Sequence, residues 1–336
     1  INMNNIKKIG LTALAGSLVA SSAMAAAVTA SGSSSIGLTQ VSGTQTTQST
    51  NAPLGGNGFS MGNSVTFSGS GEMDNGMTVS ISFELDNGAA NGTLSPFDSH
   101  SIKVDTNGLG TITFAGHGGS TVMDNWDDMT PNAFEEVWDV TDNNGAATND
   151  GGGNNSFFYS NSLDMGVNVY ASYTNQSAGM VESYQDWGVS YTGIEGLTVG
   201  YAEGENKQTA AAFDEQSTMY LTYAYGPVTV GYQTAESDVQ GGATSDADTM
   251  IYGISYAVND DLSVSYGVHE YEYGNTSLVD QESSGVSISY TMGSISISGA
   301  LNETDNVGGE SATQEDGYYV SCLLYTSPSP RDRTRS

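Results

Sequence analysis

The sequence is poor in basic residues, cysteine and proline. Its 336 residues contain seven Lys and Arg against 38 Asp and Glu, with one Cys and six Pro. Nucleic-acid binding needs basic side chains that neutralise phosphates, so this charge balance excludes a nucleic-acid partner. A single Cys leaves no disulfide framework. The chain also lacks any run of about 18 apolar residues, so we predict no membrane-spanning helix.

The first 25 residues have the pattern of a secretory signal peptide. A positive start at residues 7–8 precedes an apolar run at residues 9–20, and Ala-Met-Ala at residues 23–25 supplies the small residues of a cleavage site. The apolar run is too short and wrongly flanked for a spanning helix. We therefore predict that residues 1–25 are removed on export, in preference to a buried N-terminal helix.

The last 16 residues differ in composition from the rest of the chain. Residues 321–336 contain Cys322, every Arg and two of the six Pro. The stretch CLLYTSPSPRDRTRS resembles translated sequencing-adapter read-through, which predicts an artefactual tail; a genuine basic tail is the alternative. Without both ends, residues 26–320 keep two Lys and 37 of the 38 acids, a net charge of −35. The absence of Cys from this part fits an exported protein that does not rely on disulfides.

Apolar residues alternate with small polar residues in many short segments of residues 26–320. Residues 77–85 (MTVSISFEL) and 262–268 (LSVSYGV) are two of the clearest. Alternation with a period of two is the signature of a strand with one apolar and one polar face. Low hydrophobicity with high charge also fits a disordered chain, but the alternation favours an ordered β protein.

Two kinds of connector take turns between these segments. Seven connectors are short, such as Asp74–Gly76 and Thr106–Gly108, where Asn-Gly favours a tight hairpin because both residues tolerate positive φ. Eight connectors are long and rich in acids, Gly and Asn; they span roughly residues 43–63, 87–98, 117–155, 175–184, 205–214, 236–247, 273–282 and 303–316. Seven short turns and eight long loops predict sixteen strands, of which 33–42 and 156–163 show the weakest alternation.

Tyrosines recur beside the short turns. Tyr191, Tyr225, Tyr256 and Tyr290 are spaced by 34, 31 and 34 residues. Bands of Tyr are typical of a membrane–water interface, because the ring is apolar and the hydroxyl is polar. Tyr in the core of a β-sandwich is the alternative, but a sandwich does not alternate short turns with long loops so regularly. We predict an all-β fold, a 16-stranded antiparallel transmembrane β-barrel with a water-filled bore.

One stretch of the chain is more specific than the rest. Gly108–Gly116 (GLGTITFAG) is followed by a long acidic loop without Lys or Arg and then by Asn155–Ser160 (NSFFYS). On these residues, the segment 26–320 resembles the outer-membrane general diffusion porins of Gram-negative bacteria, most of all the alphaproteobacterial type. The resemblance implies a homotrimer in outer-membrane lipid that passes small hydrophilic solutes and cations. It also implies that the third long loop, residues 117–155, folds into the barrel and constricts the pore with Asp124, Asp127, Asp128, Glu135, Glu136 and Asp139.

The sequence departs from the porin pattern in two places. General porins set a cluster of Arg or Lys opposite the loop acids, whereas residues 26–320 have no Arg. Lys103 is the one candidate, because strand alternation points it to the lumen, while Lys207 falls in a predicted long loop. The family's last strand ends in an aromatic residue, and only Asp316–Val320 matches the start of such a strand. Carboxylates in a narrow aqueous pore favour cations, so we predict a cation-preferring channel.

Other functions remain as alternatives or are disfavoured. Glu135–Glu136 and Asp127–Asp128 could form a catalytic acid pair, but adjacent acids in an acidic loop are usually solvated charge. The three His show no metal-ligand spacing, so we predict no enzyme and no cofactor, with structural calcium at the acidic loops left open. The main alternative is a secreted acidic β-rich adhesin or surface-layer protein. A channel specific for one nutrient cation or sugar is also left open.

Overall fold

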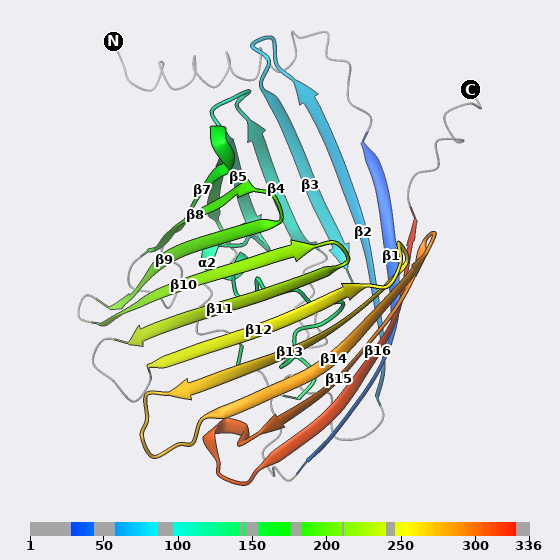
Figure 1. Cartoon of the computed structure of the whole chain (residues 1–336). Helices are drawn as coiled ribbons and strands as arrows, with labels where there is room; N and C mark the ends of the chain where they lie inside the picture. Colours follow the sequence, from blue (N-terminus) through cyan, green and yellow to red (C-terminus); the bar gives the residue numbers. More distant parts are fainter. Residues whose placement is uncertain are drawn as a thin grey trace.

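The chain folds into a closed β-barrel (Figure 1). The computed structural model describes residues 28–43, 58–86, 97–141, 144–145, 154–175, 183–209, 212–239 and 246–326. The predicted signal peptide lies outside these residues. Each strand pairs antiparallel with its neighbours in sequence, and β1 pairs with β16 to close the sheet. Within this part of the chain, no helix is long and apolar enough to cross a membrane.

The described residues form sixteen strands, as the count of turns and loops predicted. They are β1 (Thr29–Gly43), β2 (Gly58–Glu72), β3 (Thr78–Asp86), β4 (Phe97–Asp105), β5 (Thr111–His117), β6 (Ser156–Ser162), β7 (Val167–Thr174), β8 (Tyr184–Ile194), β9 (Leu197–Thr209), β10 (Ala212–Tyr225), β11 (Val228–Val239), β12 (Ala247–Ala257), β13 (Leu262–Tyr273), β14 (Gln281–Met292), β15 (Ile295–Asp305) and β16 (Gln314–Thr326). The short helical elements are α2 (Val122–Asn125), η1 (Asp164–Gly166) and η2 (Val307–Gly309).

Alternate residues of each strand face opposite sides of the wall. On β8, Trp187 and Val189 are exposed on the outside, whereas Asp186 and Ser190 are buried on the lumen side. The apolar side chains thus face outward and the polar ones inward, which is the reverse of a water-soluble barrel. This arrangement suits lipid, where a closed sheet leaves no unpaired backbone edge. The predicted 16-stranded barrel is confirmed.

The seven short connectors all join consecutive strands. In the turn between β2 and β3, the Gly76 amide donates to the Met73 carbonyl over 2.8 Å, and Gly76 has a φ of 81°. Asn107, in the turn between β4 and β5, has a φ of 57°. Positive φ is strained for most side chains but accessible to Gly and Asn, which is why these dipeptides located the hairpins.

Several strand ends differ from the prediction. Residues 58–63, predicted as loop, belong to β2, and most of the predicted loop 205–214 is strand, since β9 ends at Thr209 and β10 begins at Ala212. Lys207 therefore lies on β9, and its placement in a long loop was wrong. The segment 205–214 resembles a loop because outward positions such as Glu205 are acidic in place of apolar, whereas residues 58–63 resemble one because they are rich in Gly, Ser and Asn.

The last strand also extends beyond the predicted boundary of the barrel. β16 continues to Thr326 and so includes the first six residues of the segment 321–336. Cys322 lies in register with Ile36 of β1 and Ile297 of β15, and it is a free thiol. Residues 321–326 thus help to close the barrel.

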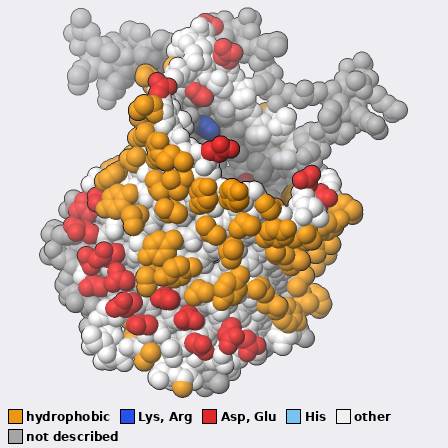
Figure 2. Space-filling view, viewed as in Figure 1, with side chains coloured by type: hydrophobic (Ala, Val, Ile, Leu, Met, Phe, Trp, Pro, Cys, Tyr) orange, Lys and Arg blue, Asp and Glu red, His pale blue; other side chains and the backbone are white. Residues whose placement is uncertain are grey.

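The outer wall carries an apolar band bordered by acids. In Figure 2, hydrophobic side chains cross the wall, and acidic side chains gather along its lower left edge, where Figure 1 shows long loops joining the later strands. The pairing register places these acids at outward positions of β9–β16. We call them the outer acidic belt: Glu203, Glu205, Glu215, Glu236, Asp238, Asp248, Glu270, Glu272, Glu282, Glu303, Asp305 and Asp316.

Candidate functional site

The segment after β5 turns into the barrel and follows its inner wall. Its described part, residues 118–141 and 144–145, contacts inward-facing residues from β7 to β16. In Figure 1 this segment is visible behind the front strands β9–β13. It is the third long loop in chain order. The described part of the loop therefore lies inside the lumen, over more than half of its circumference, and we call residues 118–141 and 144–145 the inner loop.

The inner loop begins with the short helix α2, whose side chains anchor it. The Thr121 hydroxyl caps the helix by accepting from the Asp124 amide over 3.0 Å. Val122 and Met123 are completely buried, and the Met123 amide donates to Asp186 Oδ2 on β8 over 2.9 Å. Asp186 also accepts from Ser172 on β7. This buried carboxylate thus holds the start of the loop against the wall.

Trp126 is one of two buried tryptophans that anchor the loop. Its ring packs edge-on against Tyr220 of β10 at 5.1 Å and against Tyr170 of β7 at 5.4 Å between ring centroids. With Val122 and Met123 it forms a small apolar core inside an otherwise polar lumen. Burial of such a ring stabilises docking by about 1.5–3 kcal/mol.

A single glutamine on β11 ties down the next part of the loop. The Gln233 side chain is completely buried, and its Oε1 accepts from the Met129 amide over 2.6 Å. Its Nε2 donates to the carbonyls of Trp126 and Asp127, over 2.6 and 3.2 Å, and to Thr218 Oγ1 over 2.9 Å. Gln233 therefore pairs backbone groups that would otherwise be buried without partners, each costing about 1–3 kcal/mol.

The second half of the loop crosses β13 to β16. Each wall strand there supplies one contact or more, so the path of the loop is fixed along its length. The contacts are Ala133 N to Ser265 Oγ (2.8 Å), Trp138 with the His269 ring (4.4 Å between centroids), Phe134 N to Ser287 Oγ (3.1 Å), Asn302 Nδ2 to the Glu136 carbonyl (3.0 Å), Thr141 Oγ1 with Thr304 Oγ1 (2.6 Å) and Phe134 with the Tyr319 ring (5.4 Å between centroids).

Glycines on the wall make room for the loop. A Cβ at Gly188 of β8 would lie 2.8 Å from Val122 Cγ1 and 3.0 Å from Trp126 Cη2. A Cβ at Gly267 of β13 would lie 2.7 Å from Val137 Cγ1. Both separations are below normal carbon–carbon contact. The wall thus has glycines at these positions, where a larger residue would collide with the loop.

The structure brings five of the six predicted loop acids into one cluster. Asp127, Asp128, Glu135, Glu136 and Asp139 repel one another electrostatically, with Glu136 subject to all four others. We call these five residues the loop acid cluster. Asp124, the sixth, lies on α2 and acts only on Asp127 within this set. The loop itself contains no Lys or Arg.

Burial and mutual repulsion make these carboxyls weak acids. Burial, followed by the charge of Asp139, raises the pKa of Glu136 to about 9. Burial, then a hydrogen bond with Asp139 and its charge, raises the pKa of Glu135 to about 7. Burial raises the pKa of Asp128 to about 6, although hydrogen bonds from Thr130 and Asn132 oppose the rise. Burial also raises the pKa values of Asp127 and Asp139. The cluster therefore gains its charge stepwise across the neutral range.

Lys103 lies where strand alternation predicted. It sits on the inner face of β4, in register with Ser80 and Thr113, and it is exposed. The loop contacts described above involve β7 to β16, and in a closed barrel of sixteen strands β4 lies across the lumen from β12. A Cβ at Gly253 of β12 would meet Thr130 of the loop. Lys103 thus faces the loop from the opposite wall.

The residues that hold the loop were missed by the sequence reasoning. Gln233 and Trp126 have no local pattern that distinguishes them from other lumen-facing or loop residues. For Asp186 the sequence offers one signal, which is an acid at a lumen-facing position of β8. Among the residues that the structure describes, no three or more Asp, Glu, His or Cys side chains are grouped as a metal ion would require. Parts of several acidic loops considered for calcium lie outside those residues.

Comparison with known proteins agrees with this architecture. A model of the Gram-negative porin family matches residues 10–309. The chain belongs to the Gram-negative porins. Porins are channels of the outer membrane, so this porin is an outer-membrane diffusion channel and not an enzyme. The match confirms the resemblance to porins that Gly108–Gly116 and Asn155–Ser160 indicated. It gives no support to the alternative of a secreted adhesin.

Solved porin structures share the fold of this porin at low sequence identity. The anion-selective porin from Comamonas acidovorans has 13% identity and a TM-score of 0.66, with 90% of this chain and 100% of that chain covered. OmpT of Vibrio cholerae, in its trimer form, gives the same identity, TM-score and coverage. A mutant of the Rh. blastica porin has 14% identity and a TM-score of 0.62, covering 89% and 100%. No curated protein matches the sequence.

Proposed function

We propose that this porin is a cation-preferring channel whose inner loop constricts the pore and filters charge. The observation that supports the proposal is the loop acid cluster, five carboxyls held inside the lumen by a loop without basic residues. Rings of carboxylates in a narrow pore attract cations and repel anions. Asp124 and Lys103 complete the set of predicted constriction residues. Lys103, on the opposite wall, supplies one positive charge against several negative ones.

The charge filter acts on ions that pass between the inner loop and the wall formed by the first strands. Many inward positions there are Ser or Thr, such as Ser80 and Thr113, which exchange hydrogen bonds with water and carry no charge. The strand register also places Glu84, near the long-loop end of β3, on this inward face. A hydrated cation therefore meets the loop carboxylates on one side and mainly hydroxyls, with Glu84 and Lys103, on the other. Most of the charge of the filter lies on the loop, with Lys103 as its positive counterpart.

Zero-current potentials in planar bilayers test the proposed selectivity. The protein, purified from outer membranes, is placed between KCl solutions of unequal concentration. We expect a reversal potential of the sign set by K⁺ and a larger value in dilute salt, because the screening length is about 10 Å at 0.1 M but about 3 Å at 1 M. A reversal potential of the sign set by Cl⁻ would overturn the proposal.

The selectivity should depend on pH. Each carboxyl is neutral below its pKa and negative above it, and the pKa values of Asp128, Glu135 and Glu136 are raised to about 6, 7 and 9. We expect the cation-to-anion permeability ratio to rise about fivefold between pH 5 and pH 9.5, because one added charge at 4 Å is worth about 1 kcal/mol even in bulk water. Reversal potentials across this range measure it. A ratio that stays flat above pH 5 would contradict the assignment, and Glu136→Gln should remove the highest-pH step.

We also infer that the porin assembles as a homotrimer, is exported through a cleaved signal peptide and needs no cofactor. The trimer is supported by OmpT of Vibrio cholerae, whose solved structure is a trimer form. Each barrel contains its own inner loop, so the proposed filter does not depend on contacts between subunits. Mass measurement of the detergent-solubilised protein, before and after heating, distinguishes a trimer from a monomer.

A further inference from the structure

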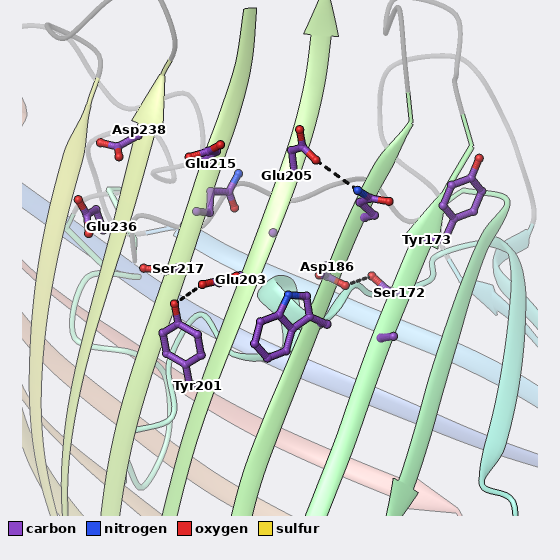
Figure 3. Close-up of a pocket in the computed structure, with 15 residues that line it drawn as sticks. Ser172, Tyr173, Asp186, Tyr201, Glu203, Glu205, Glu215, Ser217, Glu236 and Asp238 are labelled. Atoms are coloured by element: carbon purple, nitrogen blue, oxygen red, sulfur yellow. Dashed lines mark hydrogen bonds between the residues drawn. The ribbon is translucent and has the colours of Figure 1, made fainter.

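The outer wall has a hollow that the channel function does not use. It spans β7 to β11 on the lipid-facing side and has a volume of about 790 Å³ (Figure 3). The hollow lies where the apolar band meets the outer acidic belt, so aromatic side chains and carboxylates line it together. We call it the outer hollow. Its aromatic residues and most of its carboxylates lie at outward positions of the strands, which separates them from the loop acid cluster inside the lumen.

Six carboxylates line the outer hollow, and five of them lie at outward positions, Asp186 being the inward one. Glu203 and Glu205 belong to β9, Glu215 to β10, and Glu236 and Asp238 to β11. In Figure 3, Asp238, Glu215 and Glu205 lie in a row across neighbouring strands, with Glu236 and Glu203 below them. The register sets Glu205 directly opposite Glu215, and Glu215 directly opposite Asp238. Like charges directly opposed across strands destabilise a sheet, so this row gains stability from a positively charged partner.

Aromatic side chains form the other part of the lining. Tyr173, Trp187 and Tyr201 are 43%, 45% and 39% exposed. The rings of Trp187 and Tyr201 lie 5.9 Å apart at an angle of 62°, and the Tyr201 hydroxyl donates to Glu203. Exposed aromatic faces attract organic cations by about 0.5–2 kcal/mol and also pack against apolar chains. Aromatic rings beside carboxylates thus match a group that is both cationic and apolar.

The spread of the carboxylates distinguishes between kinds of cation. Neighbouring strands lie about 4.8 Å apart, so Glu205 and Asp238, on β9 and β11, are separated by about 10 Å along their row. A calcium ion holds its ligands at about 2.3–2.6 Å, so it could bridge neighbours but not the whole row. A headgroup with several amines can reach all three positions, and each amine can pair with one carboxylate.

We propose that the outer hollow binds an amphiphile whose headgroup carries two or more amines. The amines pair with the row Glu205, Glu215 and Asp238, and the apolar part of the molecule lies on Trp187 and Tyr201, continuous with the apolar band that faces the lipid. The membrane supplies the second half of this arrangement, because the apolar part that leaves the hollow enters lipid. The site is on the opposite face of the wall from the channel and is independent of the proposed cation preference.

Binding of a labelled lipopeptide tests the proposal. The probe is dansyl-labelled polymyxin B, which carries several amines and an acyl chain, and its fluorescence anisotropy is measured with the porin in a neutral detergent. We expect the triple variant Glu205→Gln, Glu215→Gln, Asp238→Asn to raise the Kd about tenfold, a loss equivalent to about 1.4 kcal/mol. Removing opposed charges relieves repulsion, so this variant should fold at least as well as the parent.

A matched variant separates the outer hollow from general acidity. Glu282→Gln, Glu303→Gln and Asp316→Asn remove the same charge from the outer acidic belt on β14 to β16, and the Kd should change less than about twofold. Trp187→Leu should weaken the binding of the lipopeptide but not the binding of spermine, because spermine has amines and no apolar chain. Equal losses in the two triple variants, or equal affinity for spermine and the lipopeptide, would overturn the proposal. Unchanged conductance in every variant would show that the result does not bear on the channel.

Discussion

Neutralising three loop acids should abolish most of the selectivity of the channel. In the variant Glu135→Gln, Glu136→Gln, Asp139→Asn, we expect the cation-to-anion permeability ratio at pH 9.5, above the pKa of about 9 of Glu136, to fall by about tenfold or more. Two charges 4 Å apart interact by about 1 kcal/mol in bulk water and about 4 kcal/mol at an effective dielectric constant of 20, and the partly buried cluster lies between these limits. Reversal potentials in dilute KCl give the ratio directly.

The control is a variant with the same loss of charge outside the lumen. Glu282→Gln, Glu303→Gln and Asp316→Asn lie on the outward face of β14 to β16, where the barrel wall separates them from the pore. This variant should keep the selectivity of the parent. If both variants lost selectivity equally, the net charge of the protein, and not the loop acid cluster, would set the preference. Single-channel conductance in 1 M KCl should change little in either variant, because screening is strong there.

Removing the tryptophan that anchors the first half of the inner loop should widen the pore. Trp126 is 5% exposed and packs between Tyr170 and Tyr220. Trp126→Ala deletes this contact, and truncation of a buried Trp costs about 3–5 kcal/mol. We expect the first half of the loop to leave the wall and the channel to admit larger sugars. Liposome swelling with sugars of increasing size measures the exclusion limit.

A second tryptophan supplies the control for this experiment. Trp187 lies one residue away from the loop-contacting Gly188 on the same strand, but it points outward and is 45% exposed. Trp187→Ala should leave the exclusion limit unchanged. If Trp126→Ala also left it unchanged, the inner loop would not be the element that limits solute size. Heat-dependent mobility on gels should show an intact barrel in both variants, since the strand pairing does not involve the loop.

The barrel could be predicted because short segments of sequence are enough to identify each strand and each tight turn. Alternation within residues 77–85 identifies one strand, and Asn107–Gly108 identifies one turn, without knowledge of the rest of the chain. Where the outward positions turn acidic, as at Glu203 and Glu205, the same rule fails, because a lipid-facing pattern stops at the edge of the lipid. The predicted strands on either side of residues 205–214 were too short for this reason.

The fastening of the inner loop could not be predicted in the same way. Gln233 meets Met129 across 104 residues of sequence, and nothing near either residue indicates the partner. The acids themselves are visible in the sequence as a loop without basic residues, and the structure brings five of the six together. Their pKa values depend on how far packing removes them from water, and no spacing in the sequence gives that.

The raised pKa values also affect stability. A group whose pKa is higher in the folded state than in the unfolded state stabilises the fold at low pH and loses that contribution as the pH rises through the folded value. For Glu136 this window runs from 4.5 up to about 9. The inner loop is therefore held most firmly when its acids are protonated, and the charge that filters ions opposes its docking.

The glycines under the inner loop limit how such a channel can be re-engineered. Gly188 and Gly267 would each collide with the loop if they carried a Cβ. The inner surface of the wall is therefore complementary in shape to this particular loop. A constriction loop grafted from another porin would face glycines where it has no side chain to fit, and larger side chains where its own side chains need space. Loop and wall are consequently not interchangeable parts, and an exchange of pore specificity between relatives has to move both together.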